Sequence, residues 1–283
     1  MYNVPAGQNP FHDVFITEPN NLYEDNSIVS PNLRFGYSRQ LYDPEDTTGK
    51  RAYYFQHNDE EEMPPHGADP NSRIYAAYQH MLHKYSRCST AIDENVGRVL
   101  EYLEQENLLD NTIIVYTSDQ GYFLGQHELI DKRLMYEESL KMPFIIRYPA
   151  EVPAGAVCEE LAGNVDFART ILDFAGVEPD PDMQGRSFRS VAQGQTPGDW
   201  RDAIFYRWKK GPAHWGIRTR GYKLILIGSL GDVNNPNIEL YDIMADPYEM
   251  NNLADDPAYA DEIQALRDRL SELIVEVNYT GEV

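Results

Sequence analysis

The spacing of apolar residues predicts a long helix after an irregular start of the chain. From Ser72 to Leu109 apolar side chains recur at steps of three and four residues, which is typical of one face of an amphipathic helix, with room for one kink or break. Cys88 falls on that face and is expected in the core. Residues 1–71 show no sustained period and are rich in Pro, Asn, Asp and Tyr, so an irregular segment is expected there.

Two short runs of β-branched and aromatic residues after this helix predict strands. They cover residues 112–118 and 144–148, and each run is continuous, as in a strand that is buried on both faces. A helix followed by a tight turn and a buried strand favours a mostly parallel α/β sheet. Asn164 is predicted to cap a short amphipathic helix over residues 165–175.

From about residue 198 the pattern changes to short β segments joined by turns. The helix predicted over residues 257–277 is amphipathic and is expected to pack on them. We therefore divide the chain into residues 1–197, part of an α/β domain, and residues 198–283, a small antiparallel subdomain. The predicted strands of this subdomain are 203–208, 215–219, 223–227 and 239–243, with Arg220-Gly221 as a hairpin turn.

Charge and composition narrow the possible partners. The chain has 24 Lys and Arg against 46 Asp and Glu, a formal net charge of -22, which argues against nucleic-acid binding. An anionic substrate would need a local cluster of cations to overcome this charge. No run of about 18 apolar residues and no signal peptide is present, so we expect a soluble chain with no membrane partner. Two cysteines are too few for a disulfide scaffold.

The first candidate site follows the predicted strand 112–118. Asp119-Gln120-Gly121 comes directly after it, and open α/β sheets bind ligands beyond the carboxyl ends of their strands. A carboxylate and an amide oxygen suit a hard cation such as Ca²⁺, although Ca²⁺ takes six to eight oxygen ligands and these two fill only part of a shell. The alternative is that Asp119 caps the next segment while Gly121 permits a turn.

Ionisable residues gather in the following stretch and supply the cations that the net charge requires. They are His127, Asp131, Lys132, Arg133, Glu137 and Glu138. Here the sequence NTIIVYTSDQGYFLGQHELIDKRLMYEESLKMPFIIRYP, residues 111–149, resembles the second signature region of the type I sulfatases, which belong to the alkaline-phosphatase superfamily. The later stretches MQGRSF, HWGIRTRGYKLI and ELYDIMADPYEMNNL also resemble that family, so the similarity covers about residues 70–260.

The resemblance implies a fold and an activity. The fold would be an alkaline-phosphatase-like α/β domain with a mostly parallel sheet between helices, truncated at its N-terminal side, plus a small C-terminal antiparallel lobe. The activity would be hydrolysis of sulfate esters on carbohydrates. By this similarity Asp119 and Gln120 are calcium ligands, although many members have His or Asn at the second position. Lys132 matches the lysine that holds the sulfate oxygens, a role suited to a compact ammonium.

Three further residues are expected near the substrate. Arg133 and His127 accompany Lys132, although His127 fits equally well as a histidine bonded within its loop. His214 precedes a segment that in similar sulfatases approaches the sugar. Arg218 and Lys223 flank that segment, where alternating charges on a hairpin are typical of a solvated face.

Parts of the family's catalytic machinery are not found. No Cys or Ser stands in a Cys/Ser-x-Pro-x-Arg motif, the source of the formylglycine nucleophile, and the paired N-terminal aspartates that complete the calcium shell are not found after a first strand. We therefore expect a fragment that is inactive and poorly stable alone, with the N-terminal half of the same enzyme as a partner. A non-catalytic binding module and a phosphoryl or phosphonyl hydrolase of the same superfamily are the alternatives. Members of the family are usually exported.

Overall fold

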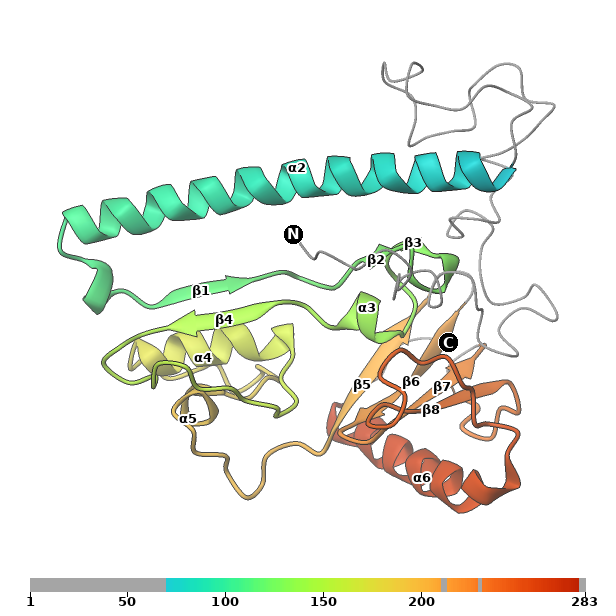
Figure 1. Cartoon of the computed structure of the whole chain (residues 1–283). Helices are drawn as coiled ribbons and strands as arrows, with labels where there is room; N and C mark the ends of the chain where they lie inside the picture. The colour runs from blue at the N-terminus through green and yellow to red at the C-terminus, as the bar shows by residue number, and fades with distance from the viewer. Residues whose placement is uncertain (1–69, 210–212, 229–230, 280–283) are drawn as a thin grey trace. The chain divides into compact units, whose positions relative to one another are not determined.

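The computed structural model describes residues 70–209, 213–228 and 231–279 (Figure 1). These residues form two compact units. One comprises residues 70–109 and 122–132, and the other comprises 110–121 and the described residues from 133 onward. Almost all of the expected irregular segment 1–71 lies outside the described residues. No helix among those described is long and apolar enough to cross a membrane.

The first unit is dominated by one helix, α2 (Pro70–Gln105), which confirms the predicted periodic segment. Pro70 suits the start of a helix because the first N–H groups have no partner within it. The helix runs through without the break that the sequence allowed. Cys88 is exposed with a free thiol, so its predicted place in a core is wrong. Tyr85 and Ile92 on the same stripe are exposed too, because periodicity identifies an apolar face but supplies nothing to cover it.

The second unit contains the two predicted strands as β1 (Ile114–Thr117) and β4 (Phe144–Arg147). They pair antiparallel, with Val115 opposite Ile146, and in the part of the chain that the structure describes each has only the other as a neighbour. An antiparallel strand is common in an otherwise mostly parallel sheet. Burial on both faces is not found: Val115 is 43% exposed and Ile145 63% exposed.

A buried carboxylate organises the region after β4. Asp166 ends a 3₁₀ turn (Asn164–Asp166) before α4 (Phe167–Phe174), and it accepts hydrogen bonds from the backbone N–H of Gly163 and of Arg186, both at 2.8 Å. Arg201 binds both of its oxygens at 2.5 and 2.6 Å. Asn164 was predicted to cap this helix, but its amide donates to the Asp119 carbonyl oxygen instead. The Asp166 carboxylate caps the 3₁₀ turn by accepting the Gly163 N–H, and α4 itself has no side-chain cap.

The C-terminal part of this unit is a four-stranded antiparallel sheet, as the sequence predicted, and its strand order is β5-β6-β7-β8. The strands are β5 (Ala203–Trp208), β6 (His214–Thr219), β7 (Tyr222–Ile227) and β8 (Ile238–Asp242).

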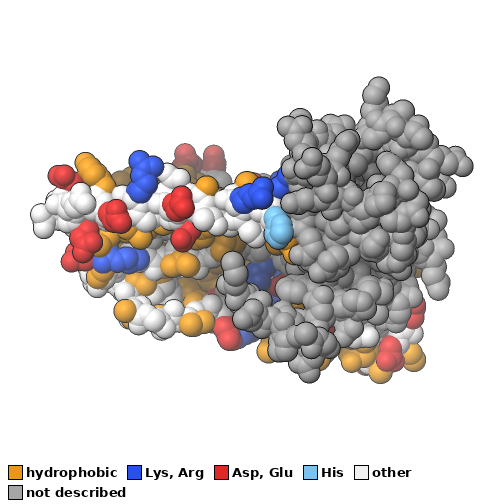
Figure 2. All heavy atoms as spheres, turned by 45° about the horizontal axis from the view of Figure 1, so that its top comes forward, with side chains coloured by type: hydrophobic (Ala, Val, Ile, Leu, Met, Phe, Trp, Pro, Cys, Tyr) orange, Lys and Arg blue, Asp and Glu red, His pale blue; other side chains and the backbone are white. Residues whose placement is uncertain are grey.

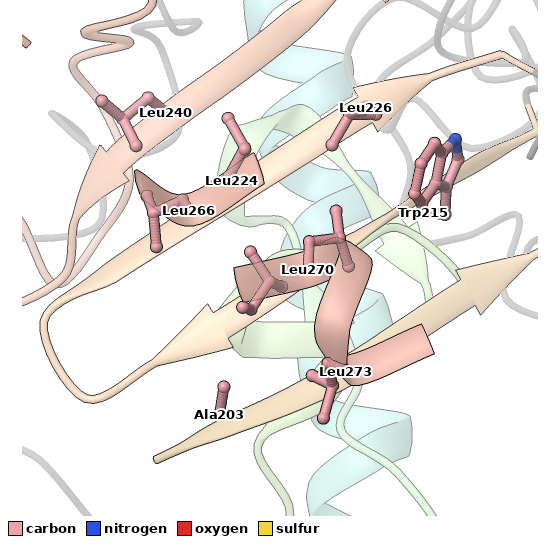
Figure 3. Close-up of a cluster of buried hydrophobic side chains, with 9 residues drawn as sticks. Ala203, Trp215, Leu224, Leu226, Leu240, Leu266, Leu270 and Leu273 are labelled. Atoms are coloured by element: carbon pink, nitrogen blue, oxygen red, sulfur yellow. The ribbon is translucent and has the colours of Figure 1, made fainter. Parts of the chain in front are cut away.

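The last helix, α6 (Ala260–Glu276), covers one face of this sheet. Leu266, Leu270 and Leu273 project from α6 toward the sheet (Figure 3). They pack on buried residues of all four strands, namely Ala203, Trp215, Ile217, Leu224, Leu226 and Leu240. The amphipathic pattern of the last helix is thereby confirmed, while the domain boundary at 197/198 stays a prediction.

Candidate substrate and metal site

The predicted metal ligands directly follow β1. Asp119 is exposed, and its carboxylate accepts a hydrogen bond from the Ser118 hydroxyl at 3.2 Å. Gln120 is half-buried. Since the Asp119 carbonyl is held by the Asn164 amide at 3.1 Å, the backbone of this strand end is fixed while the carboxylate remains accessible.

Gly121 holds the same strand end close to the short helix α3 (Glu137–Leu140). Its N–H donates to the Ser139 carbonyl at 2.9 Å, and a Cβ on this residue would lie 2.1 Å from the Glu138 carbonyl oxygen. Only glycine permits this approach, because Cβ atoms are not found so close to a backbone oxygen. The sequence suggested that Gly121 permits a turn. In the structure, Gly121 permits a close contact between two backbone segments.

The donor set fits calcium in kind but only as part of a shell. Asp119 and Gln120 offer oxygen atoms, which Ca²⁺ prefers, but they are two where six to eight are needed. Within the described ranges no group of three or more His, Cys, Asp or Glu side chains is placed to hold a metal ion. The pair Asp255-Asp256 precedes the last helix, where the Asp256 carboxylate accepts the Ala258 N–H at 2.9 Å as a cap.

His127 and Lys132 lie in the first unit, around a small antiparallel hairpin. Its strands are β2 (Phe123–Leu124) and β3 (Ile130–Asp131). His127 is fully buried in the turn with its ring edge-on to Phe123, which favours a structural role in the loop. The Lys132 ammonium lies 3.8 Å from the Asp131 carboxylate, and its side chain is 37% exposed. An ion pair this long and this accessible is weak, so the ammonium can turn to an anion at little cost.

Arg133 begins the part of the second unit that packs against the C-terminal sheet. Its backbone has φ 101°, its N–H donates to the Ser139 hydroxyl at 2.9 Å, and its carbonyl accepts the hydroxyl of Tyr206 on β5. Burial raises the pKa of Tyr206 to about 12, so the phenol stays a donor at neutral pH. His214 on β6 is buried, with its ring 5.6 Å from that of Tyr206. Its contact with a substrate stays a prediction.

Lys223 was expected on a solvated face, and this prediction is wrong. Its side chain is 0% exposed, and its ammonium lies 2.9 Å from Glu137 and 2.7 Å from Glu249. Arg218 is also largely buried, and its Nε and Nη2 donate to the two carboxylate oxygens of Glu137 at 2.9 and 3.1 Å. The physical reason is that the face of the sheet opposite α6 is covered by residues 133–139, so charges on that face are buried in pairs.

The two carboxylates in this group have shifted pKa values in opposite directions. Burial raises the pKa of Glu137, but Lys223 and Arg218 outweigh it and bring the value from 4.5 down to about 2. Burial also raises the pKa of Glu249, and there the attraction of Lys223 offsets only part of the effect. Sequence reasoning missed this group, although one signal was available: period-two alternation along β7 puts Lys223 opposite the core residues Leu224 and Leu226.

Comparison with known proteins identifies the family. The sulfatase family model matches residues 9–177, and a model described as the C-terminal part of N-sulphoglucosamine sulphohydrolase matches residues 125–276. The chain belongs to the sulfatase family. Both models include the stretch 125–177, in which Lys132 and Arg133 lie.

The relatives of this sulfatase chain are considerably longer than the parts that it matches. It is 48% identical over 203 residues to N-acetylglucosamine-6-O-sulfatase of Bacteroides thetaiotaomicron, covering 69% of the chain and 36% of the relative. It is 29% identical over 215 residues to a multifunctional alkaline phosphatase superfamily protein of Trinickia caryophylli, covering 69% of the chain and 41% of that protein. The chain thus spans between 36% and 41% of the lengths of these two curated relatives.

A solved structure confirms the fold class. The structure of a protein in complex with its substrate D-glucosamine-2-N,6-O-disulfate superposes with a TM-score of 0.67 at 34% identity, over 96% of the sulfatase chain and 62% of that protein. The alkaline-phosphatase-like α/β fold predicted from the sequence is therefore correct.

Proposed function

We propose that the protein to which this chain belongs hydrolyses sulfate esters on carbohydrates, with 6-O-sulfated glucosamine residues as the substrate class. The observation that carries this proposal is the 48% identity to an N-acetylglucosamine-6-O-sulfatase. The likeness to a protein solved with a glucosamine disulfate substrate supports it.

Lys132 is the residue proposed to bind the sulfate group. Its ammonium can neutralise a non-bridging or leaving oxygen as negative charge develops there. The half-exposed side chain and its long contact with Asp131 are consistent with this role. Arg133 would add a second positive charge, which is needed in a chain of net charge -22 because a distant negative field slows the encounter with an anion. His127 and His214 are also proposed as substrate-binding residues, and the side chains of both are buried.

Asp119 and Gln120 are proposed as part of a Ca²⁺ site. When bound, the ion would polarise the sulfate group and stabilise developing negative charge. One carboxylate gives a weak site, so we expect millimolar affinity for Ca²⁺ from the chain alone. Calorimetry with Ca²⁺ on the chain and on Asp119→Ala tests this expectation. Micromolar binding that Asp119→Ala removes would show that the remaining ligands are already present.

The formylglycine nucleophile and the remaining calcium ligands are proposed to come from outside these 283 residues. No Cys/Ser-x-Pro-x-Arg motif occurs in the sequence. The exposed apolar side chains of β1 and β4 support a missing neighbour, since such strands are normally covered. The chain alone is therefore expected to hydrolyse neither an aryl sulfate nor a sulfated sugar above background.

A chimera tests the activity directly. The part of the Bacteroides thetaiotaomicron relative that matches this chain would be replaced by the chain, and hydrolysis of 6-O-sulfated N-acetylglucosamine would be measured. We expect turnover that falls at least about 100-fold in Lys132→Ala, as is common when one oxyanion-stabilising donor is lost. The exposed Lys141 provides the matched control, and Lys141→Ala should leave turnover unchanged. A folded chimera without turnover, or a Lys132-dependent activity in the chain alone, would contradict the proposal.

A second candidate is a phosphoryl or phosphonyl hydrolase. It is favoured by the 29% identity to a multifunctional alkaline phosphatase superfamily protein. The same chimera, assayed with a phosphonate monoester, separates the two activities, and faster cleavage of the phosphonate would favour this candidate. The non-catalytic alternative predicts binding of the sulfated sugar with no turnover in either assay.

A further inference from the structure

The face of the C-terminal sheet opposite α6 is occupied by residues 133–139. On β6, Trp215 and Ile217 point to the α6 core, so the alternate residue Gly216 lies on the opposite face. A Cβ on Gly216 would come within 3.0 Å of the Met135 sulfur and 2.1 Å of the Leu224 carbonyl oxygen. Tyr136 lies beside Met135, and both side chains are buried. The segment that follows Lys132 therefore packs closely on this face of the sheet at Met135.

Polar groups fix the same segment at each end. At its start, the Tyr206 hydroxyl binds the Arg133 carbonyl and the Ser139 hydroxyl binds the Arg133 N–H. At its end, the Glu249 carboxylate accepts the Glu137 N–H at 2.6 Å.

Between these ends, the Tyr136 hydroxyl donates to Glu239 on β8 at 2.8 Å. Glu239 also accepts the hydroxyl of Tyr241 at 3.1 Å. Arg133, Met135, Tyr136 and Glu137 thus each contact the sheet or the loop that carries Glu249.

Two residues in this contact have strained backbones. Arg133 has φ 101° and Glu249 has φ 53°, values that a residue with a side chain rarely adopts. Such conformations are unfavourable and persist only where the surroundings hold them. The buried ammonium of Lys223 bridges the two anchoring carboxylates, Glu137 and Glu249. Removal of that charge would leave two carboxylates facing each other inside the protein.

We propose that Tyr206, Lys223 and Glu249 form a sheet clamp that positions the Lys132–Arg133 peptide for sulfate binding. Lys132 is joined to Arg133 by one peptide bond, so holding the Arg133 backbone restricts where the Lys132 ammonium can reach. The value of such a clamp lies in pre-organisation, because a displacement of about 1 Å in a positioning group can cost 100-fold in rate. The three are positioning residues that act through the segment 133–139. This inference rests on the proposed role of Lys132.

The test uses the whole 283-residue chain and needs no turnover. Hydrogen exchange by mass spectrometry reports the protection of amides 133–140, and a titration with inorganic sulfate followed by NMR reports anion binding. Wild type should bind sulfate, and Lys132→Ala should abolish that binding. In Lys223→Met we expect exchange in 133–140 to rise at least about 10-fold and the Kd for sulfate to rise about 10-fold or more, while α6 amides keep their protection.

Two further variants make the outcome decisive. Arg220→Met removes a cation from the same hairpin, where Arg220 forms an exposed pair with Glu159, and it should change neither measurement. If Lys223→Met fails to fold, Tyr206→Phe decides, because it deletes only the hydroxyl that holds Arg133 and should weaken sulfate binding with little change in Tm.

Each outcome separates the clamp from the proposed function. Folded clamp variants that retain wild-type sulfate affinity and protection would overturn the clamp. If wild type shows no Lys132-dependent sulfate binding while exchange in 133–140 still rises in Lys223→Met, the proposed function fails and the clamp on the segment stands.

Discussion

Strands β7 and β1 are both rich in apolar residues, yet their surroundings are very different. On β7, Leu224 and Leu226 are fully buried in the core with α6, and Lys223 and Ile225 on the opposite face are buried as well. On β1, Val115 is exposed, and Ile145 of the paired strand is exposed as well. Apolar side chains also reach the surface in the space-filling view of the described residues (Figure 2). An apolar strand sequence therefore indicates that a cover is needed, not that this chain provides it.

The two regions also differ in what stabilises them. The sheet β5–β8 has a continuous apolar core with α6. The region from β4 to α5 (Arg189–Ala192) relies more on charged groups, with Asp166 bound by Arg201 and with Arg189 bound by Glu151 and Asp173. A region with few covered apolar side chains can thus hold its loops by ion pairs, at the cost of dehydrating the charges.

The largest expected effect comes from removing the buried ion pair between Arg201 and Asp166. Arg201→Ala would leave the fully buried Asp166 without its bidentate partner. We expect the free energy of unfolding to fall by about 4 kcal/mol, as is typical when one partner of a buried pair is removed. Urea denaturation measures this change. Arg220→Ala, which removes a pair exposed on both sides, should cost under about 1 kcal/mol, and similar losses in the two variants would contradict the assignment.

The second largest effect tests the apolar core between α6 and the C-terminal sheet. Leu270 is fully buried between α6 and the sheet, so Leu270→Ala should lower the free energy of unfolding by about 3 kcal/mol through lost burial and the cavity left behind. Ile145→Ala on β4 removes a comparable volume from a 63% exposed site and should cost under about 1 kcal/mol in the chain alone. An equal loss in the two variants would mean that β4 is covered in solution.

A smaller effect is expected from the titration of Glu137, which binds Lys223 of the sheet clamp. The pKa of Glu137 is about 2 in the folded chain and 4.5 without its partners, so its contribution is complete above pH 4.5 and is lost as pH falls toward 2. Linkage gives a fall of about 2 kcal/mol in the free energy of unfolding between pH 5 and pH 3.

The control for this titration is Glu137→Gln. It should be less stable at pH 7 and should show a shallower slope between pH 5 and pH 3. The raised pKa of Glu249 acts in a different window, above pH 4.5, where its ionisation lowers stability as pH rises. An unchanged slope in Glu137→Gln would show that other carboxylates carry the acid sensitivity.

The smallest expected effect on the chain alone tests whether the exposed face of β4 is covered in a longer protein. Ile145→Lys places a charge on the open face of β4 and should change the free energy of unfolding of the chain by no more than about 0.5 kcal/mol. In the chimera with the longer relative, the same substitution would bury that charge if the face is covered there, and the melting temperature should fall by several degrees. Thermal melts of both proteins with and without Ile145→Lys measure the difference. Equal shifts in the two would contradict a cover on this face.

Local sequence was sufficient for most of the secondary structure. The four strands of the C-terminal sheet, the turn at Arg220-Gly221 and the amphipathic last helix follow from period-two and period-3.6 patterns that act over a few residues. The signature in residues 111–149 indicated the family, because it preserves the order of chemical groups along the chain. The positions of Asp119, Lys132 and Arg133 in that signature are likewise a property of the sequence alone.

Tertiary structure decided which of these patterns are buried. In the sequence, Lys223 resembles any charged residue on a hairpin. In the structure, residues 133–139 cover that face of the sheet, and Glu137 and Glu249 neutralise the Lys223 ammonium. Cys88 lies on an apolar stripe as the sequence indicates, yet it is exposed. The physical reason is that periodicity is set by neighbours along the chain, whereas burial and the pKa of a buried charge are set by groups that only folding brings close.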